Sequence, residues 1–227
     1  MASGGKIIPV SNISAPVRAS LNDPDVISLG LEEIEKCFPS GGVRLGQLMM
    51  LIGGNGSGKT MLASQVVSSI VAQDHNCLFF ELETDLATLW SRFETQALAK
   101  GPGKEATVRE QLQDKLLIID NVPSGAPKKM TPKRVENLIK EAELEHFGDP
   151  VEVVVIDSLM LMGPRATSGQ LMHELSRICK RNHVLMIVLN TTPKTVPAGT
   201  SFKPEGMGSS QQVGFCDYVL QIWRRDI

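Results

Sequence analysis

The chain is poor in aromatic residues and has no strong charge bias. Phe, Trp and Tyr make up 4% of its 227 residues, so a buried core has to be built from Val, Ile, Leu and Met. The formal net charge at pH 7 is −2. It provides no overall attraction to nucleic acid, so any such binding must come from a local basic patch or from backbone amides. Length and composition fit one globular domain with a full-sized core.

Signals for secretion, membrane insertion and zinc binding are also missing. The N-terminal residues Met-Ala-Ser-Gly-Gly-Lys lack the apolar segment of a signal peptide. The longest apolar stretch, 151–162, is interrupted by Glu152 and Asp157 and is too short to cross a bilayer. The cysteines form no C-x-x-C pair, which favours reduced thiols over a zinc site. We therefore expect a soluble protein of a reducing compartment, the cytoplasm.

A glycine-rich motif follows a strong strand signal. The apolar run 48–52 is followed at residues 53–60 by the pattern G-x-x-x-x-G-K-[ST], and helical spacing of apolar residues begins at Lys59. Glycines let backbone N–H groups approach phosphate oxygens, and the positive end of the helix adds a favourable field. We predict an ATP site in which Lys59 reaches the β- and γ-phosphates and Thr60 binds Mg²⁺. The predicted nucleotide-binding residues of the motif are Gly53, Gly54, Asn55, Gly56, Ser57, Gly58, Lys59 and Thr60.

Strand and helix signals alternate along the chain. This order predicts an α/β fold with a mostly parallel β-sheet flanked by helices on both faces, and a ligand at the carboxyl ends of the strands. We expect residues 28–227 to form this domain and residues 1–27 to form a flexible N-terminal arm. Strands are expected at 48–52, 77–82, 116–119, 151–156, 184–189 and 218–223, and helices at 29–38, 59–73, after Asp85, at 104–113, 132–146 and around 171–179.

Acidic residues stand at the ends of two expected strands. Asp157 follows the run 153–156 and can hold Mg²⁺ directly or through water, with a structural cap of the next turn as the alternative. Glu81 and Glu83 compete for the role of the base that polarises the attacking water, unless both lie on a solvated edge. Because side chains alternate along a strand, the two glutamates should share one face. Glu83 lies beyond the strand end and therefore nearer the expected cleft.

Polar residues also follow the strand at 184–189. Asn190 and Thr191 could contact the γ-phosphate and relay its presence to the next loop, although ordinary turn chemistry explains them equally well. The loop 194–212 carries glycines and serines whose amides and hydroxyls could contact a nucleic-acid backbone. The basic residues elsewhere are more often solvated than bound to phosphate; they include Lys128, Lys129, Lys133, Arg134, Lys180 and Arg181.

These motifs make the chain resemble the RecA-fold P-loop ATPases, and among them the motor domain of DnaB-type replicative helicases. Residues 79–83 are similar to that family's F-x-L-E stretch, and residues 156–162 to its I-D-Y-L-Q-L-M. The resemblance implies that Glu83 is the catalytic base and that the subunits form a ring, usually of six. It also implies that ATP lies between neighbouring subunits and that loops in the central channel grip single-stranded DNA.

The chain departs from the helicase pattern in two places. The family's glutamine after the sensor strand is replaced by Thr191. The sequence also stops before the segment that carries the family's trans-acting lysine–arginine pair, so either it is a fragment or another arginine serves, with Arg224 and Arg225 as candidates. The segment 157–166 resembles RecA/RadA-type recombinases too. We therefore expect a DNA-binding helicase motor that works as a ring, or else a recombinase filament or a nucleotide-dependent switch with little turnover. A viral protein of this kind would act in the host cytoplasm.

Overall fold

The computed structural model describes residues 24–99, 101, 104–120, 130–163, 168–191 and 210–222. Within these residues, six strands form one sheet in the order β5-β4-β6-β7-β3-β8, and every neighbouring pair is parallel. The predicted parallel sheet is confirmed, with small shifts at the strand ends. Its strands are β3 (Leu48–Gly53), β4 (Cys77–Glu81), β5 (Leu116–Asp120), β6 (Val153–Asp157), β7 (Leu185–Thr191) and β8 (Tyr218–Ile222).

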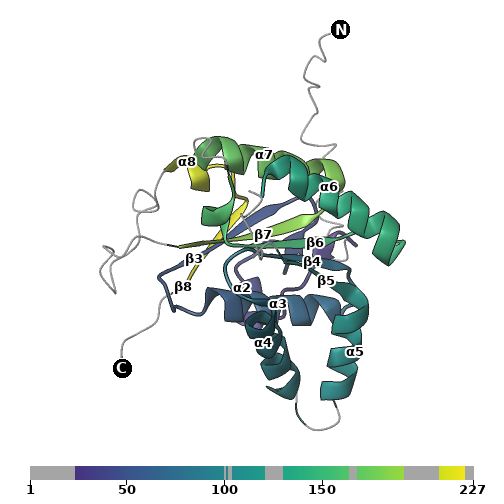
Figure 1. The fold of residues 1–227 in the computed structure, drawn as a ribbon. Coiled ribbons are helices and arrows are strands. Elements are labelled where there is room, and N and C mark those ends of the chain that lie inside the picture. The colour runs from purple at the N-terminus through teal and green to yellow at the C-terminus, as the bar shows by residue number, and fades with distance from the viewer. Residues whose placement is uncertain are drawn as a thin grey trace, which may run out of the picture.

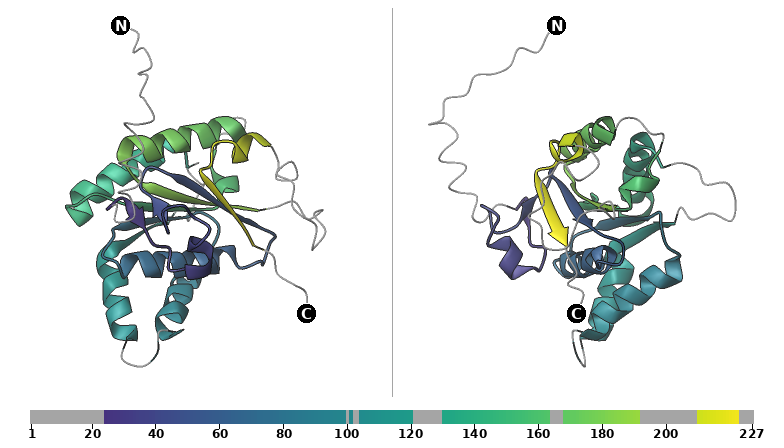
Figure 2. Two further views of the ribbon diagram at one scale, coloured as in Figure 1. Left: turned by 180° about the vertical axis from the view of Figure 1, so that it is seen from behind. Right: turned by 90° about the vertical axis from the view of Figure 1, so that its left-hand side faces the viewer.

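Helices cover both faces of the sheet, as the alternating signals predict (Figure 1). Helices α3, α4 and α5 pack on one face, and α6, α7 and the short α8 pack on the other. The side and back views of Figure 2 show the same three layers. In the described part of the chain, no helix has the length and apolar content needed to cross a membrane. The helices are α2 (Glu32–Glu35), α3 (Lys59–Val71), α4 (Leu86–Ala99), α5 (Glu105–Lys115), α6 (Pro132–Ala142), α7 (Ser168–Asn182) and α8 (Ser210–Val213).

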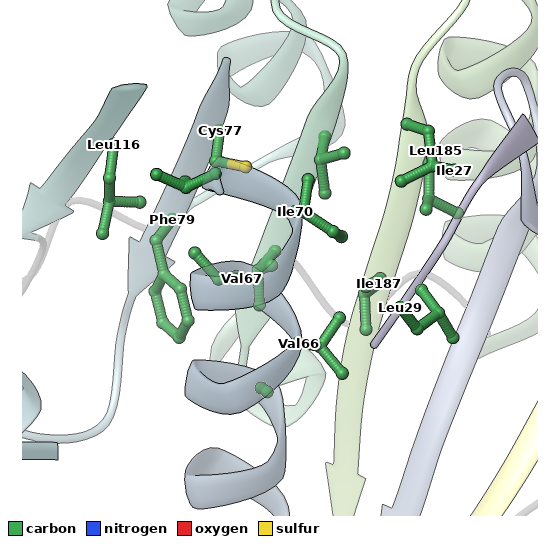
Figure 3. Close-up of a cluster of buried hydrophobic side chains, with 14 of the residues drawn as sticks. Ile27, Leu29, Val66, Val67, Ile70, Cys77, Phe79, Leu116, Leu185 and Ile187 are labelled. Atoms are coloured by element: carbon green, nitrogen blue, oxygen red, sulfur yellow. The ribbon is translucent and has the colours of Figure 1, made fainter. Parts of the chain in front are cut away.

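The core consists of two apolar clusters, one on each face of the sheet. Successive residues of a strand contribute to opposite clusters: Met49 of β3 faces α3, whereas Met50 faces the α6 and α7 side. Both kinds of position are apolar, which is why the strands read as unbroken hydrophobic runs. Figure 3 shows the first cluster, to which α3, β4, β5 and β7 contribute side chains; the labelled residues there include Val66, Val67, Ile70, Phe79, Leu116 and Ile187.

The helix expected over 29–38 is much shorter than predicted. Its N-terminal part is not helical: Leu29 is buried in the core and Gly30 has a left-handed φ of 69°. The carboxylate of Glu35 accepts hydrogen bonds from the Ser28 hydroxyl and from the Leu29 N–H, which holds the segment against the end of the helix. Helix α2 therefore begins only at Glu32.

The expected Thr131 cap is confirmed, whereas the helix that follows changes character before its end. The Thr131 hydroxyl accepts the N–H of Arg134 at 3.3 Å, and Pro132 is the first helical residue. Helix α6 continues as a π-helical turn, η2 (Glu143–Phe147), which ends at Gly148 with a φ of 70°. Another short turn, the 3-10 helix η3 (Leu159–Leu161), follows β6.

The folded domain begins earlier than the boundary at residue 28. Strand β1 (Val26–Ile27) pairs antiparallel with β2 (Val43–Arg44), and Ile27 is fully buried, so these residues belong to the domain rather than to the expected arm. Other predictions fall outside the described residues: the arm up to residue 23, most of the loop 194–212, the basic residues Lys128 and Lys129, and the candidate trans-acting residues Arg224 and Arg225.

Candidate active site

The glycine-rich segment 53–60 forms the loop between β3 and α3. Gly58 stands just before α3 with a φ of 95°, a left-handed conformation that glycine adopts without strain. Gly53 ends β3, where a Cβ would come within 2.4 Å of the Ser57 hydroxyl and 2.9 Å of the Ile222 carbonyl. No described side chain caps the start of α3, so its first N–H groups are available to an anion. The loop has the open backbone cradle that phosphate binding requires.

Lys59, the first residue of α3, is buried at the edge of this loop. Its ammonium donates hydrogen bonds to the carbonyl oxygens of Gly53 at 3.0 Å and Gly54 at 2.9 Å. Burial lowers the pKa of Lys59, and the negative charges of Asp157 and Glu83 offset part of that shift. Because the bonded partners are neutral carbonyls, the ammonium can exchange them for phosphate oxygens.

The side chains of Thr60 and Asp157 are in contact at the carboxyl end of the sheet. The Thr60 hydroxyl donates to Oδ2 of Asp157 at 2.6 Å, although the two residues come from α3 and from the end of β6. Asp157 is only 2% exposed. Burial raises the pKa of the Asp157 carboxyl, and the Thr60 hydrogen bond opposes that rise. A hydroxyl and a carboxylate side by side are hard oxygen donors of the kind that Mg²⁺ prefers.

The two competing glutamates turn out to lie in different environments. Glu83 is exposed and lines the same pocket as Lys59 and Asp157. Glu81 is 0% exposed and is not part of that lining, and burial raises the pKa of its carboxyl. The expectation that both share one face of a strand is wrong, because β4 ends at Glu81 and the chain leaves the sheet before Glu83. The geometry thus favours Glu83 as the group that faces the phosphates.

The phosphate loop, the end of β4 and the end of β6 together enclose a pocket of about 270 Å³. It brings together residues that are far apart in the sequence, as predicted for the carboxyl ends of parallel strands. Gly53, Gly54 and Ser57 belong to the loop but do not line the pocket. The lining residues are Asn55, Gly56, Gly58, Lys59, Thr60, Met61, Glu83, Thr84, Arg92 and Asp157.

Arg92 and Thr84 are pocket residues that the sequence reasoning missed. Arg92 lies on α4, and its positive charge lowers the pKa of Asp157. The Arg92 Nη1 and the Thr84 Oγ1 are both buried without a hydrogen-bond partner. One signal could have revealed Arg92: it is a charged residue directly before Phe93, next to the buried stripe of α4. The pocket therefore contains a second cation besides Lys59.

Asn190 and Thr191 lie beside the phosphate loop in the sheet but outside the lining of the pocket. Thr191 pairs with Gly53 in the β3–β7 register. The Asn190 side chain donates to Oε1 of Gln212 at 3.1 Å and accepts the Thr191 N–H at 3.0 Å. Their contact with a nucleotide stays a prediction, and the structure gives Asn190 a partner at the far end of the following loop.

The residues present suit a nucleotide with its Mg²⁺. Among the described residues, no group of three or more His, Cys, Asp and Glu side chains is arranged to hold a metal by itself. Mg²⁺ is usually bound by one or two protein oxygens together with substrate phosphates. Thr60 and Asp157 would provide those protein oxygens, next to an uncapped helix N-terminus.

The solved structures that share this fold include two ATPases or helicases. One is described as an ATPase domain: it has a TM-score of 0.74 and 14% identity, and the match covers 96% of this chain and 84% of that one. The other is described as "The Structure Of A DnaB-Like Replicative Helicase And Its Interactions With Primase", with a TM-score of 0.76 and 14% identity. That match covers 97% of this chain, which spans only 57% of the helicase chain. At such identity the likeness establishes the fold, which is that of the DnaB-like ATPase domains.

A comparison with protein families gives the same class of enzyme. The family model described as "ATPase: KaiC" matches residues 27–203, which is more than half of the 227-residue chain. The matched range contains the phosphate loop, Glu83, Arg92 and Asp157. The interpretation of the sequence as a RecA-fold P-loop ATPase is confirmed, and the chain belongs to the KaiC family of ATPases.

Proposed function

We propose that this ATPase is a DnaB-like motor that uses ATP hydrolysis to act on single-stranded DNA. The observation that most supports ATP turnover is the convergence of the phosphate loop, Glu83 and Asp157 on one pocket, from three separate segments of the chain. The nucleic-acid part is supported by the similarity in fold to a replicative helicase. Such a motor would assemble into rings.

In the proposed hydrolysis, the phosphate loop, Lys59, Glu83, Arg92, and the pair of Thr60 and Asp157 have separate roles. The N–H groups of the loop and of α3 bind the phosphate oxygens, and Lys59 leaves its carbonyl partners to bind the β- and γ-phosphates. Glu83 accepts the proton of the attacking water, and Arg92 adds positive charge to the same pocket. Thr60 and Asp157 would hold Mg²⁺, which when bound neutralises phosphate charge.

The end of β7 gives this site a connection to the loop that we assign to DNA. Thr191 is paired with Gly53, the last residue before the phosphate loop turns away from the sheet. Asn190 is bonded to Gln212, so residues close to the two ends of the segment 192–209 are in contact. A shift of the phosphate loop on hydrolysis would thereby reach both ends of that segment.

The test is the rate of ATP hydrolysis by the purified full chain, with and without a single-stranded oligonucleotide and at several salt concentrations. A motor should hydrolyse ATP faster when DNA is bound, and the stimulation should weaken as salt rises. A rate that DNA leaves unchanged even at low salt would refute the motor. Particle images add the assembly: closed rings agree with a helicase, whereas helical filaments indicate a recombinase.

A nucleotide-dependent switch with little turnover is the second candidate. Thr191 stands where the related helicases have a glutamine, and Asn190 and Thr191 both lie outside the lining of the nucleotide pocket. Both observations weaken a relay from the γ-phosphate to DNA. A switch would show slow hydrolysis without DNA stimulation, and a change in protease sensitivity between the ATP-bound and ADP-bound protein.

A further inference from the structure

Glu81 is a buried carboxylate directly behind the pocket, and the proposed hydrolysis does not use it. It is the last residue of β4, it is 0% exposed, and it pairs with Asp157 in the β4–β6 register. Its Oε2 has no hydrogen-bond partner. An acid in such a place is unfavourable unless it does something that an apolar residue cannot do.

The other oxygen of Glu81 holds the backbone of the next turn. Oε1 accepts the N–H of Glu83 at 2.9 Å and the N–H of Thr84 at 2.7 Å. Both bonds go to one atom, so they fix the direction in which the chain leaves the sheet. Thr84 and Glu83 are both lining residues of the pocket.

Only these two residues separate two rigid elements. On one side, the Leu82 N–H still bonds the Asp157 carbonyl at 2.7 Å, as part of the sheet. On the other side, Asp85 begins α4 by accepting the Thr88 N–H at 2.9 Å. The backbone between Leu82 and Asp85 therefore has Glu81 as its fixed support.

We propose that Glu81 is a positioning residue for ATP hydrolysis, whose side-chain oxygen fixes the turn that points Glu83 at the γ-phosphate. The role requires a hydrogen-bond acceptor at this place and does not require a negative charge. The inference rests on the proposed role of Glu83 as the base. Misplacement of a reacting group by about 1 Å can reduce a rate by about 10²-fold, so loss of the acceptor should reduce turnover strongly.

Two substitutions separate the acceptor from the charge. Glu81→Gln keeps an oxygen that can accept both N–H groups, and Glu81→Leu has a similar shape without any acceptor. We expect the Gln variant to keep kcat within about 3-fold of the wild type and the Leu variant to lose about 10- to 100-fold in kcat. KM and the affinity for a fluorescent ADP should change little in either, because the phosphate loop is untouched.

Glu143 supplies the matched control. Its Oε1 also accepts a backbone N–H, that of Val151 at 3.1 Å, but at the amino end of the sheet and outside the nucleotide pocket. Glu143→Leu should lower the melting temperature without changing kcat. A fall in kcat that comes from general loss of stability would appear in this variant as well.

The outcomes decide between the roles. Equal kcat in the Leu variant and the wild type overturns the inference, and so does a Gln variant as slow as the Leu variant, which would mean that the charge matters. If the Leu variant does not fold, amide hydrogen exchange of the wild type decides: slow exchange at Glu83 and Thr84 supports the bonds, and free exchange refutes them. Glu83→Gln is measured in parallel, because full activity there would refute the role of Glu83 itself rather than that of Glu81 alone.

Discussion

The two ends of the sheet treat polar side chains in opposite ways. At the carboxyl end, four buried side-chain atoms lack a hydrogen-bond partner, and they are the only such atoms among the described residues. They belong to the phosphate loop, to the end of β4, or to the turn and helix that follow β4: Ser57, Glu81, Thr84 and Arg92. At the amino end, ionisable side chains contact one another, as in His75–Glu152 at 2.9 Å and Lys115–Asp74 at 3.0 Å.

This difference shows that buried polar atoms without a hydrogen-bond partner indicate the site better than cavity volume does. The cavity at the amino end, lined in part by Asp74, Lys115 and Glu152, has a volume of about 590 Å³, whereas the nucleotide pocket has about 270 Å³. Buried polar groups are normally bonded, so unpaired ones at one end indicate groups held ready for a ligand. The paired groups at the other end serve the fold.

The largest effect on ATP hydrolysis is expected when a lysine at the carboxyl end of the sheet is replaced by alanine, and a lysine at the amino end provides the comparison. Lys59→Ala removes the ammonium that would neutralise the phosphates, and we expect the ATP hydrolysis rate to fall by about 10³-fold or more. Lys115→Ala removes the partner of Asp74 at the amino end and should leave the rate within about 2-fold, because surface pairs contribute little. Steady-state hydrolysis by both variants is the measurement. Continued turnover in Lys59→Ala would remove the basis of the assignment.

A pair of glutamates sharpens the contrast further. Glu83→Gln keeps the shape of the side chain but cannot accept a proton, so turnover should fall on the order of 10²-fold while ATP still binds. Glu152→Gln changes the partner of His75 and should not alter turnover. Binding of a fluorescent ATP analogue and single-turnover hydrolysis separate affinity from chemistry. If both variants hydrolyse ATP like the wild type, another group is the base.

The sequence was sufficient for the features that depend on strong local patterns. The apolar runs predict the six strands because parallel strands are buried on both faces, and the motif at 53–60 carries its own geometry. Asp157 could be placed because a strand tip beside a phosphate loop has few other uses. These predictions needed no knowledge of side-chain direction.

The sequence was not sufficient where side chains decide the path of the backbone. Strand alternation places Glu81 and Glu83 on one face, whereas in the structure the N–H groups of Glu83 and Thr84 donate to Oε1 of Glu81 and the chain turns out of the sheet. Arg92 enters the pocket because α4 starts immediately after that turn. Likewise, the short α2 reflects the hydrogen bond that the Leu29 N–H donates to the Glu35 carboxylate rather than helix propensity.

Removal of a buried charge from the active end should stabilise the protein. Burial raises the pKa of Asp157 above its ordinary value of 3.8, so the folded state binds a proton more readily than the unfolded state. The wild type should therefore gain stability as pH falls through the raised pKa, and lose it as pH rises. Asp157→Asn should raise the free energy of unfolding by about 1 kcal/mol at neutral pH, most clearly without Mg²⁺ and nucleotide.

Melting temperature as a function of pH provides the check for Asp157→Asn. The gain over the wild type should shrink as pH falls, because the wild-type carboxyl becomes neutral as well. The variant should also lose Mg²⁺-dependent hydrolysis, which would show that the buried charge serves function at the expense of stability. A lower melting temperature at neutral pH would mean that the charge is well compensated by Thr60 and its surroundings.

The smallest effect on stability is expected for an ion pair at the amino end. Removal of this pair should destabilise the protein, whereas removal of the Asp157 charge should stabilise it. Asp74 is 86% exposed and Lys115 is 27% exposed, so water and salt screen their attraction. A double-mutant cycle with Asp74→Ala and Lys115→Ala should give a favourable coupling of about 0.2–1 kcal/mol, which decreases at high salt. A coupling near zero would mean that the Asp74–Lys115 pair makes no electrostatic contribution to stability. A favourable coupling there, together with a gain of stability in Asp157→Asn, would mean that charged groups stabilise the fold at the amino end and destabilise it at the carboxyl end, where they serve function.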